Sequence, residues 1–198
     1  MTKLKIVGFS GNATRPSRTR GLVAAVLQEI ASRDLGETRH LDLIDVGPEF
    51  AIATHAGELG QAAREVKSVI EEADVLVVGS PIYKGAYTGL FKHFFDLFDP
   101  TSLTHKPVIL TATGGSNRHA LVIESHLRPL FSFFNVVSVP AGVFATEADF
   151  VTHDDIKAGL KPRILEAVGQ LERLVSVKPG SAPLLIPAQA VSPIEAVA

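Results

Sequence analysis

Short apolar runs recur along the chain and are separated by longer stretches with helical spacing. The most restrictive run is Asp74-Val-Leu-Val-Val-Gly79, whose consecutive aliphatic residues suit a strand buried on both faces. Such strands belong to parallel sheets with helices on both sides, joined by right-handed βαβ crossovers. Strands are predicted at Lys3–Phe9, Thr38–Leu43, Asp74–Gly79, Pro107–Thr113 and Val136–Phe144.

The stretches between these runs carry apolar residues at helical spacing. The first helix shows Leu22, Val23, Val26, Leu27 and Ile30 on one face, and Ser17 is its expected N-cap. Further helices are predicted around Leu59, Ala62, Val66, Val69 and Ile70, around Leu90, Phe91, Phe94 and Phe95, and over Ala120–Phe134. A last helical region is predicted to begin at a capping box, Thr152-x-x-Asp155, and to continue to about Val175, with a break near Gly159–Pro162. The fold class is therefore α/β: a three-layer sandwich around a five-stranded parallel sheet.

Composition excludes several function classes. Lys and Arg number 19 against 21 Asp and Glu, so the net charge is −2 and no basic surface for nucleic acid is expected. The chain has no cysteine, which excludes disulfides, thiolate metal sites and thiol nucleophiles, and no other cluster has metal-ligand spacing. No apolar run suits a membrane span or a signal peptide, so we expect a cytoplasmic protein.

Residues 1–177 are expected to form one domain. Residues 178–198 differ in composition, because they hold four of the twelve prolines and no aromatic residue. This Pro/Ala-rich segment is predicted to be an extended or flexible C-terminal tail.

Ligands of open α/β sheets bind beyond the carboxyl ends of the strands, at the point where the strand order reverses. In the order 2-1-3-4-5 this switch point lies between strands 1 and 3, beside strand 4. The loops that follow these three strands are residues 10–18, 80–87 and 113–119. We therefore expect the ligand at these loops.

The first loop, Ser10-Gly-Asn-Ala-Thr-Arg-Pro-Ser-Arg-Thr19, leads from a strand into a helix N-terminus. Backbone N–H groups at a helix start favour an anion such as phosphate. The loop matches neither the G-x-x-x-x-G-K-[ST] nor the G-x-G-x-x-G pattern. Its hydroxyls and scarce glycines favour one terminal phosphate monoester, and the alternative is a capped helix with a solvated loop.

The other two loops suit a flat ring. Ser80-Pro-Ile-Tyr-Lys-Gly-Ala-Tyr87 places a rigid turn and two aromatic rings after a buried strand, and Lys84 can reach an anion. Thr113-Gly-Gly-Ser-Asn117 has two glycines that let the backbone approach a ligand closely. Taken alone, the Ser80–Tyr87 loop is equally compatible with a βα loop whose tyrosines pack on the protein, and the Thr113–Asn117 loop with a simple turn. The three loops together favour a flat, phosphorylated cofactor.

Pro129 lies inside the helix predicted over residues 120–134. Because proline has no N–H to donate to the carbonyl of Ser125, a kink or π-bulge is expected around residues 125–129. His126 lies at this irregularity, and on these grounds alone it is a structural or surface residue.

Together these motifs resemble the flavodoxin-like NAD(P)H-dependent FMN reductases of two-component alkanesulfonate monooxygenase systems, most of all the methanesulfonate branch. Many members have G-S-x-R in the first loop, whereas here Gly11-Asn-Ala-Thr14 precedes Arg15. The resemblance spans residues 1 to about 176 and rests on Thr14-Arg-Pro-Ser-Arg-Thr19, Ser80–Tyr87, Ala112-Thr-Gly-Gly-Ser-x-Arg-His-Ala-Leu121, Leu127-Arg-Pro-Leu-Phe-Ser-Phe-Phe134 and Gly142-Val-Phe-Ala-x-Glu-Ala-Asp-Phe150.

The resemblance implies a flavodoxin-like fold with strand order 2-1-3-4-5 and a set of FMN-binding residues. It places the phosphate at Ser10, Ser17 and Thr19, with Arg15 or Arg18 beside it; the ribityl chain and isoalloxazine ring at Pro81, Ile82, Tyr83 and Lys84; and the ring edge at Thr113, Gly114, Gly115 and Ser116. His126 falls where the family carries a π-helical insertion at the oligomer interface, which implies a role in flavin exchange and not in acid–base chemistry.

The implied activity is hydride transfer from NADH or NADPH to N5 of FMN, after which reduced FMN leaves for a partner monooxygenase, with sulfonate desulfonation as the associated reaction. No residue is required as a general acid or base. A homodimer or homotetramer is expected through helix 119–134, because Leu127, Leu130, Phe131 and Phe134 exceed the apolar surface that one sheet face needs.

Two alternatives stay open. One is a reductase that keeps FMN bound and reduces a quinone, an azo dye or a metal oxyanion. The other is a non-enzymatic electron carrier or flavin-binding module. The preference for NADH or NADPH is also open, with Arg118 as a candidate contact for a 2′-phosphate.

Overall fold

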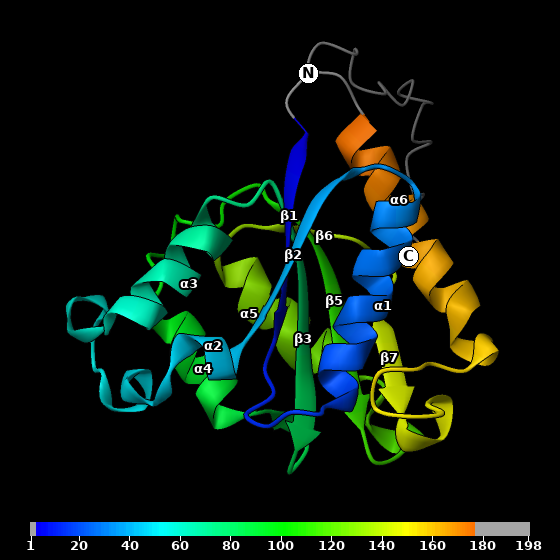
Figure 1. Ribbon diagram of the computed structural model, residues 1–198, viewed down its shortest axis with the longest axis horizontal. Coiled ribbons are helices and arrows are strands. Elements are labelled where there is room, and N and C mark those ends of the chain that lie inside the picture. The colour runs from blue at the N-terminus through cyan, green and yellow to red at the C-terminus, as the bar shows by residue number, and fades with distance from the viewer. Residues whose placement is uncertain (1–2, 177–198) are drawn as a thin grey trace, which may run out of the picture.

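The parallel sheet occupies the middle of the molecule (Figure 1). A computed structural model describes residues 3–176, so the predicted tail 178–198 lies outside the described residues. The sheet order is β2-β1-β3-β5, and β6 and β7 both pair with β5 in parallel. The predicted order 2-1-3-4-5 is thus confirmed, with strands at β1 (Leu4–Ser10), β2 (Gly36–Asp42), β3 (Val75–Tyr83), β5 (Pro107–Gly114), β6 (Val137–Ser138) and β7 (Val143–Thr146).

The edge strand predicted over Val136–Phe144 is two short strands. β6 pairs with β5 at Val108↔Ser138, and β7 resumes the pairing at Thr111↔Val143. Pro140 lies between them and has no N–H to donate to the ladder, so a continuous strand is interrupted at this point. The prediction of one strand was wrong, although both halves occupy the expected edge of the sheet.

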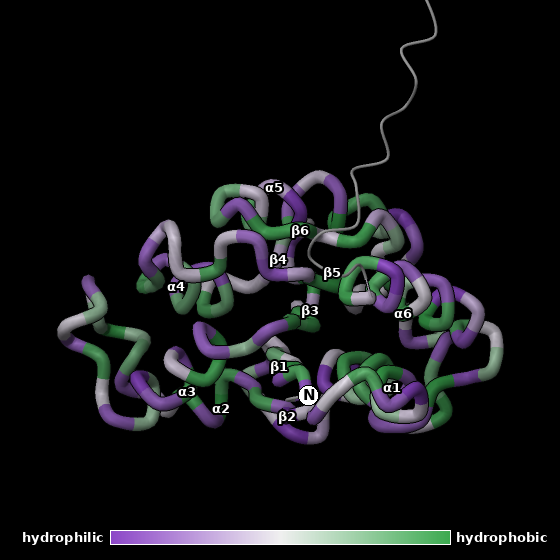
Figure 2. Tube along the Cα trace, turned by 90° about the horizontal axis from the view of Figure 1, so that it is seen from above, coloured by the Kyte–Doolittle hydropathy of each residue, from purple (hydrophilic) through white to green (hydrophobic). Residues whose placement is uncertain are grey.

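Helices cover both faces of the sheet (Figure 2). Each face has its own apolar core, one formed with α1 and α6 and the other with α3, α4 and α5. Alternate residues of β1 point to opposite faces, so Ile6 packs with α1 whereas Phe9 packs with Phe94, at a ring-centroid distance of 5.0 Å. The helices are α1 (Arg18–Ser32), α2 (Leu43–Val46), α3 (Gln61–Glu71), α4 (Gly89–Asp96), α5 (Arg128–Phe133) and α6 (Lys161–Ser176), with short 3-10 turns at Pro48–Ile52, Ala56–Glu58, Asn117–His119, Glu147–Asp149 and Ala158–Leu160.

Two helix predictions need correction. In α3 the inward-facing alanine is Ala63, whereas the predicted Ala62 is exposed. No helix begins at Thr152: residues 151–155 form an exposed turn, because Phe150 and Ile156 pair as an antiparallel bridge. The last helix instead begins at Lys161, with Pro162 in its first turn, where a missing N–H costs nothing.

The kink predicted near Pro129 is present. A π-helical segment, Ile123–Leu127, precedes α5, and Pro129 lies in the first turn of α5. The apolar side chains from which an oligomer is expected lie mostly inside the chain: Leu127, Phe131 and Phe134 are buried in the core, and Leu130 is partly buried against it. The large apolar side chains that this region does expose are Leu121 and Phe133, at 75% and 65%.

None of the helices in residues 3–176 combines the length and the apolar character of a membrane span.

Candidate functional site

A cavity of about 270 Å³ lies at the carboxyl ends of β1, β3, β5 and β7. This is the switch point at which the sequence places the ligand. Four walls surround the cavity, which we call the switch-point pocket: the first loop and the start of α1 (Asn12, Thr14, Pro16, Ser17, Arg18, Thr19), the end of β3 (Pro81, Ile82, Tyr83), the end of β5 (Thr113, Gly114, Gly115), and the last residue of β7 with the segment after it (Thr146, Glu147, His153).

Hydrogen bonds tie the first wall to the sheet. The Oγ1 atoms of Thr19 and Thr113 lie 2.5 Å apart, which joins the first turn of α1 to the end of β5. The N–H of Gly11 donates to the carbonyl of Gly79 at 2.7 Å, which extends the pairing of β1 with β3 into the loop. Ser17 caps α1 as predicted, because its Oγ accepts from the N–H of Arg20 at 3.4 Å. The helix start is thus fixed against the pocket.

The second loop forms a β-hairpin. β3 continues through Tyr83, and β4 (Ala86–Tyr87) folds back on it in antiparallel pairing. The two turn residues, Lys84 and Gly85, have φ of 56° and 89°, as a two-residue hairpin of the primed type requires. Tyr83 therefore lies at the mouth of the pocket with 66% of its surface exposed, and Lys84 lies at the exposed tip.

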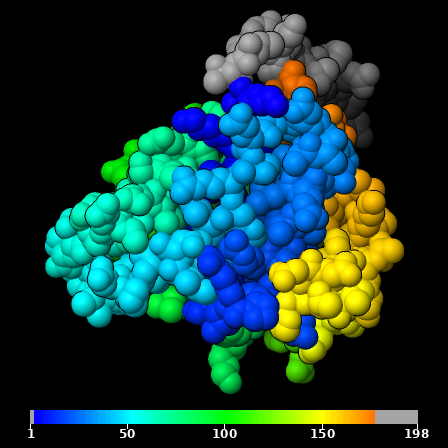
Figure 3. Space-filling model, in the orientation of Figure 1, coloured from blue at the N-terminus to red at the C-terminus, as the bar shows by residue number. Residues whose placement is uncertain are grey.

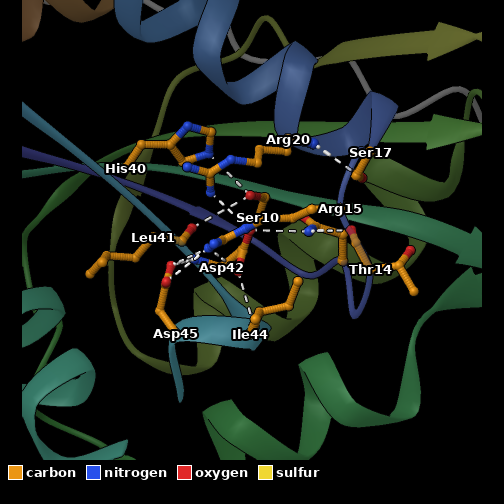
Figure 4. A network of polar contacts seen from close by, with 11 residues as sticks. Ser10, Thr14, Arg15, Ser17, Arg20, His40, Leu41, Asp42, Ile44 and Asp45 are labelled. Carbon is orange, nitrogen blue, oxygen red and sulfur yellow. Dashed lines mark hydrogen bonds and ion pairs between the residues drawn. The ribbon is translucent and has the colours of Figure 1, made fainter. Parts of the chain in front are cut away.

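A network of ion pairs lies beside the pocket and is centred on Asp42 (Figure 4). This carboxylate is completely buried, and Arg15 donates to both of its oxygens at 2.8 Å. Arg20 and Asn12 also donate to it, at 2.8 and 3.1 Å. Arg15 in addition contacts Asp45 at 2.8 Å. The network therefore holds the first loop against the end of β2.

Burial and hydrogen bonding act in opposite directions on Asp42. Burial raises the pKa of its carboxyl, but hydrogen bonds from Arg15 and Asn12 outweigh this and leave the pKa below its ordinary value. Asp42 is thus a carboxylate at neutral pH. Beside it, burial and then the charge of Arg20 lower the pKa of His40 to about 4, so this imidazole is neutral in the folded protein.

The structure brings most of the predicted site residues together. The switch-point pocket is lined by Ser17, Arg18, Thr19, Pro81, Ile82, Tyr83, Thr113, Gly114 and Gly115. The other four predicted residues, Ser10, Arg15, Lys84 and Ser116, do not line it.

Ser10 and Arg15 lie outside the pocket for different reasons, and His126 lies on another element. Ser10 is buried, and its Oγ lies 3.1 Å from Nε2 of His40, beneath the loop. Arg15 is held by Asp42 and Asp45. His126 is exposed on the π-helical segment, where its ring lies edge-on to Tyr87 at 6.2 Å.

Sequence reasoning missed one whole wall of the pocket. Thr146 ends β7, which is the neighbour of β5, and Glu147 and His153 follow it. The carboxyl ends of adjacent parallel strands meet at one edge of the sheet. The sequence signal that covers Thr146 and Glu147 is the Gly142–Phe150 motif, which contributes to the resemblance but was not assigned to the site. Asn12 also lines the pocket and is not among the predicted site residues.

Asn12 carries an unsatisfied acceptor at the pocket. It is 3% exposed, and its Nδ2 donates to the carbonyl of Thr14 at 3.0 Å and to Asp42. Its Oδ1 is buried and has no hydrogen-bond partner among the described residues. Because both neighbours of Nδ2 are acceptors, the amide orientation is fixed, and Oδ1 is left as a buried acceptor without a donor within residues 3–176.

The pocket therefore combines three chemistries. Ser17, Thr19, Arg18 and the start of α1 offer donors to an anion. Oδ1 of Asn12 suits a polyol hydroxyl, and Ile82, Tyr83 and the Gly114–Gly115 backbone offer flat surface to a ring. A flat heterocycle joined by a polyol to a phosphate monoester fits these three features, and FMN has this construction.

Comparison with known proteins shows what the whole chain is similar to. The NADH-dependent FMN reductase SfnF of Pseudomonas fluorescens (strain Pf0-1) is 46% identical over 161 residues, which cover 81% of this chain and 86% of that protein. The structure of an oxidoreductase from Corynebacterium diphtheriae matches with a TM-score of 0.76 and 33% identity, over 88% of this chain and 98% of that chain.

A flavodoxin, WrbA-like protein from Agrobacterium tumefaciens matches with a TM-score of 0.62 and 16% identity, over 89% of this chain and 100% of that chain, so it shows the flavodoxin-like fold alone. A model of the family described as NADPH-dependent FMN reductase matches residues 4–150. With the SfnF similarity, this match shows that the chain belongs to the NADPH-dependent FMN reductase family.

Proposed function

We propose that this NAD(P)H-dependent FMN reductase binds FMN in the switch-point pocket and releases reduced FMN to a partner monooxygenase. The observation that carries the proposal is the combination at one strand edge of anion donors on α1 and the unsatisfied Oδ1 of Asn12. These two features select a ligand that has both a phosphate and a hydroxyl-bearing chain.

The residues divide the ligand between them. Ser17, Thr19 and Arg18 hold the phosphate at the start of α1, and Asn12 accepts from the ribityl chain. Ile82, Tyr83 and the backbone of Gly114 and Gly115 line the ring. The bound flavin supplies the hydride acceptor, and the protein supplies position and exclusion of water. Arg15 acts indirectly, because its ion pairs with Asp42 and Asp45 hold the loop.

The small number of arginine side chains free to bind the phosphate favours release of FMN. Among the described residues, Arg18 is the guanidinium that lines the pocket, whereas Arg15 and Arg20 are bound to Asp42. A phosphate held by one guanidinium and a helix start binds moderately, and moderate binding permits exchange. The resemblance to the flavin-supplying reductases supports a monooxygenase of sulfonates as the recipient, in the cytoplasm.

The test is oxidation of NADH and of NADPH by the purified protein, followed at 340 nm with and without added FMN. A nearly colourless protein whose rate saturates with free FMN supports FMN as a substrate. A yellow protein whose rate ignores added FMN contradicts release, and favours the reductase that keeps FMN and passes electrons to another acceptor. If neither nucleotide is oxidised, the family activity itself is contradicted.

A further inference from the structure

An ion pair crosses the mouth of the switch-point pocket. Arg18, the first residue of α1, donates through Nη2 to Oε1 of Glu147, which follows β7. Both residues line the pocket, and their side chains are 36% and 73% exposed. In Figure 3 the yellow segment after β7 lies against the blue start of α1. The carboxylate thus occupies the one guanidinium that lines the pocket among the described residues.

Glu147 is held in this place by its neighbours. Oδ2 of Asp149 accepts from the N–H and the Oγ1 of Thr146, at 2.7 and 2.8 Å, in a capping box around the 3-10 turn. The same segment touches α1 at Gly21, where a Cβ atom would lie 2.1 Å from the carbonyl oxygen of His153. Glu147 therefore projects from a fixed backbone towards Arg18.

An acidic side chain in this position works against binding of a phosphate. Of the Lys, Arg, Asp and Glu side chains in the described part of the chain, Arg18 and Glu147 line the pocket. A phosphate monoester carries nearly two negative charges, so next to Glu147 it meets repulsion as well as competition for Arg18. Asp42 and Asp45 differ from Glu147, because neither they nor their partner Arg15 line the pocket.

We propose that Glu147 is an internal competitor for Arg18 that weakens binding of the phosphate of FMN and so speeds exchange of the flavin. The proposal rests on the proposed function, because it requires FMN in this pocket. It concerns the phosphate alone. Glu147 therefore tunes the affinity for FMN and has little effect on riboflavin, which has the same ring and ribityl chain without the phosphate.

The experiment measures dissociation constants of FMN and riboflavin by quenching of flavin fluorescence, for the wild type and for Glu147→Gln. Glu147→Gln is expected to tighten FMN about 3- to 10-fold, with a matching fall in the FMN dissociation rate in stopped flow, because one competing charge is removed. Riboflavin binding should change less than about twofold, and inorganic phosphate should compete with FMN more strongly in the variant.

Two further variants separate the mechanism from general charge effects. Glu172→Gln makes the same change in charge at an ion pair with Arg33, at the other end of α1, and should leave FMN binding unchanged. Arg18→Gln should weaken the binding of FMN. In that background Glu147→Gln should raise the affinity for FMN less, because the phosphate and Glu147 then have no guanidinium to compete for. Glu147→Ser repeats the test without an amide at this position.

The outcomes distinguish the two proposals. If the wild type binds neither FMN nor riboflavin, the proposed function fails and the role of Glu147 fails with it. If the wild type binds FMN but Glu147→Gln leaves the affinity unchanged, weakens it, or tightens riboflavin to the same degree, the role of Glu147 is overturned and the proposed function stands.

Discussion

At the scale of single residues, the carboxylate of Asp42 joins three side chains of the first loop and α1 to the end of β2. Arg15, Arg20 and Asn12 all donate to it, and it is completely buried. Removing a charge from such a site leaves its partners uncompensated, which costs more than the pair itself contributes. The geometry of the phosphate loop therefore depends on a residue that does not line the pocket.

Asp42→Asn is expected to lower the free energy of unfolding by roughly 2–4 kcal/mol. The same change should weaken FMN several-fold, because the first loop loses its link to β2. Urea denaturation and fluorescence titration measure the two effects. The matched control is Asp34→Asn, whose ion pair with Lys3 has an aspartate that is 83% exposed and should cost less than about 0.5 kcal/mol. Equal losses in both variants would contradict a special role of Asp42.

The titration of His40 makes the free energy of unfolding depend on pH between about 6.5 and 4. Burial, with the charge of Arg20, lowers the pKa of its imidazole from 6.5 to about 4, against the opposing effect of Asp42 and Asp45. The unfolded chain takes up this proton near pH 6.5, whereas the folded protein does so near pH 4. The stabilisation is thus complete above pH 6.5 and is lost as the pH falls towards 4.

We expect the free energy of unfolding to fall by roughly 1–3 kcal/mol across this window. Asp42 adds little to the change, because its own pKa lies below 3.8 and its stabilisation is lost only at lower pH. Denaturation of the wild type and of His40→Gln at half-unit steps from pH 7 to pH 4 measures the effect. The variant should show a flatter profile, and an unchanged slope would assign the pH dependence to other groups.

At the scale of elements, the segment after β7 is the wall that the sequence did not predict. Its shape follows from the Phe150–Ile156 bridge and the Thr146–Asp149 capping box, which turn the chain back towards α1. Gly21 permits this close approach because it has no Cβ. The contact between the segment and α1 should therefore depend on glycine at this position.

Gly21→Ala tests this contact, because the close packing and the helix propensity of alanine predict opposite changes in stability. Alanine in a helix is normally more stabilising than glycine by about 1 kcal/mol, but here its Cβ would meet the carbonyl oxygen of His153 at 2.1 Å. We expect a loss of stability and a change in FMN affinity, as the segment that carries Glu147 is displaced. Gly169→Ala in α6 is the control, since its Cβ would meet Arg33 at an ordinary 3.6 Å and should stabilise the protein. Stabilisation by both changes would contradict the close packing.

At the scale of the whole molecule, the sequence predicts the layers and the strand order but not the details of loops. The residues of a central strand such as Val75–Val78 are all buried, whichever strands pair with it. A short run of consecutive apolar residues is therefore enough to predict such a strand from the sequence. The ion-pair partner of Arg15 cannot be predicted from nearby residues, because it is Asp42, which lies 27 residues later at the end of β2. The same holds for Glu147, which meets Arg18 across 129 residues.

Oligomerisation is a prediction at the scale of the whole molecule, and most of the side chains expected at the interface are buried within the chain. Leu127, Phe131 and Phe134 pack inside the chain, whereas Leu121 and Phe133 are exposed beside the π-helical segment. Phe133 also borders an apolar cavity of about 510 Å³. Exposed apolar surface of this kind favours association, so a homodimer or homotetramer through this region remains the prediction.

Light scattering after gel filtration should give a mass that is a multiple of 21.1 kDa for the full chain. The double variant Leu121→Glu, Phe133→Glu should shift the mass towards the monomer, because the association would bury two added charges. Ile52→Glu changes an apolar residue that is 86% exposed on another element, and it should leave the mass unchanged. A monomeric wild type, or dissociation by Ile52→Glu alone, would contradict an interface at this helix. FMN binding measured on the dissociated variant then shows whether one chain suffices for the pocket, as its four walls from one chain lead us to expect.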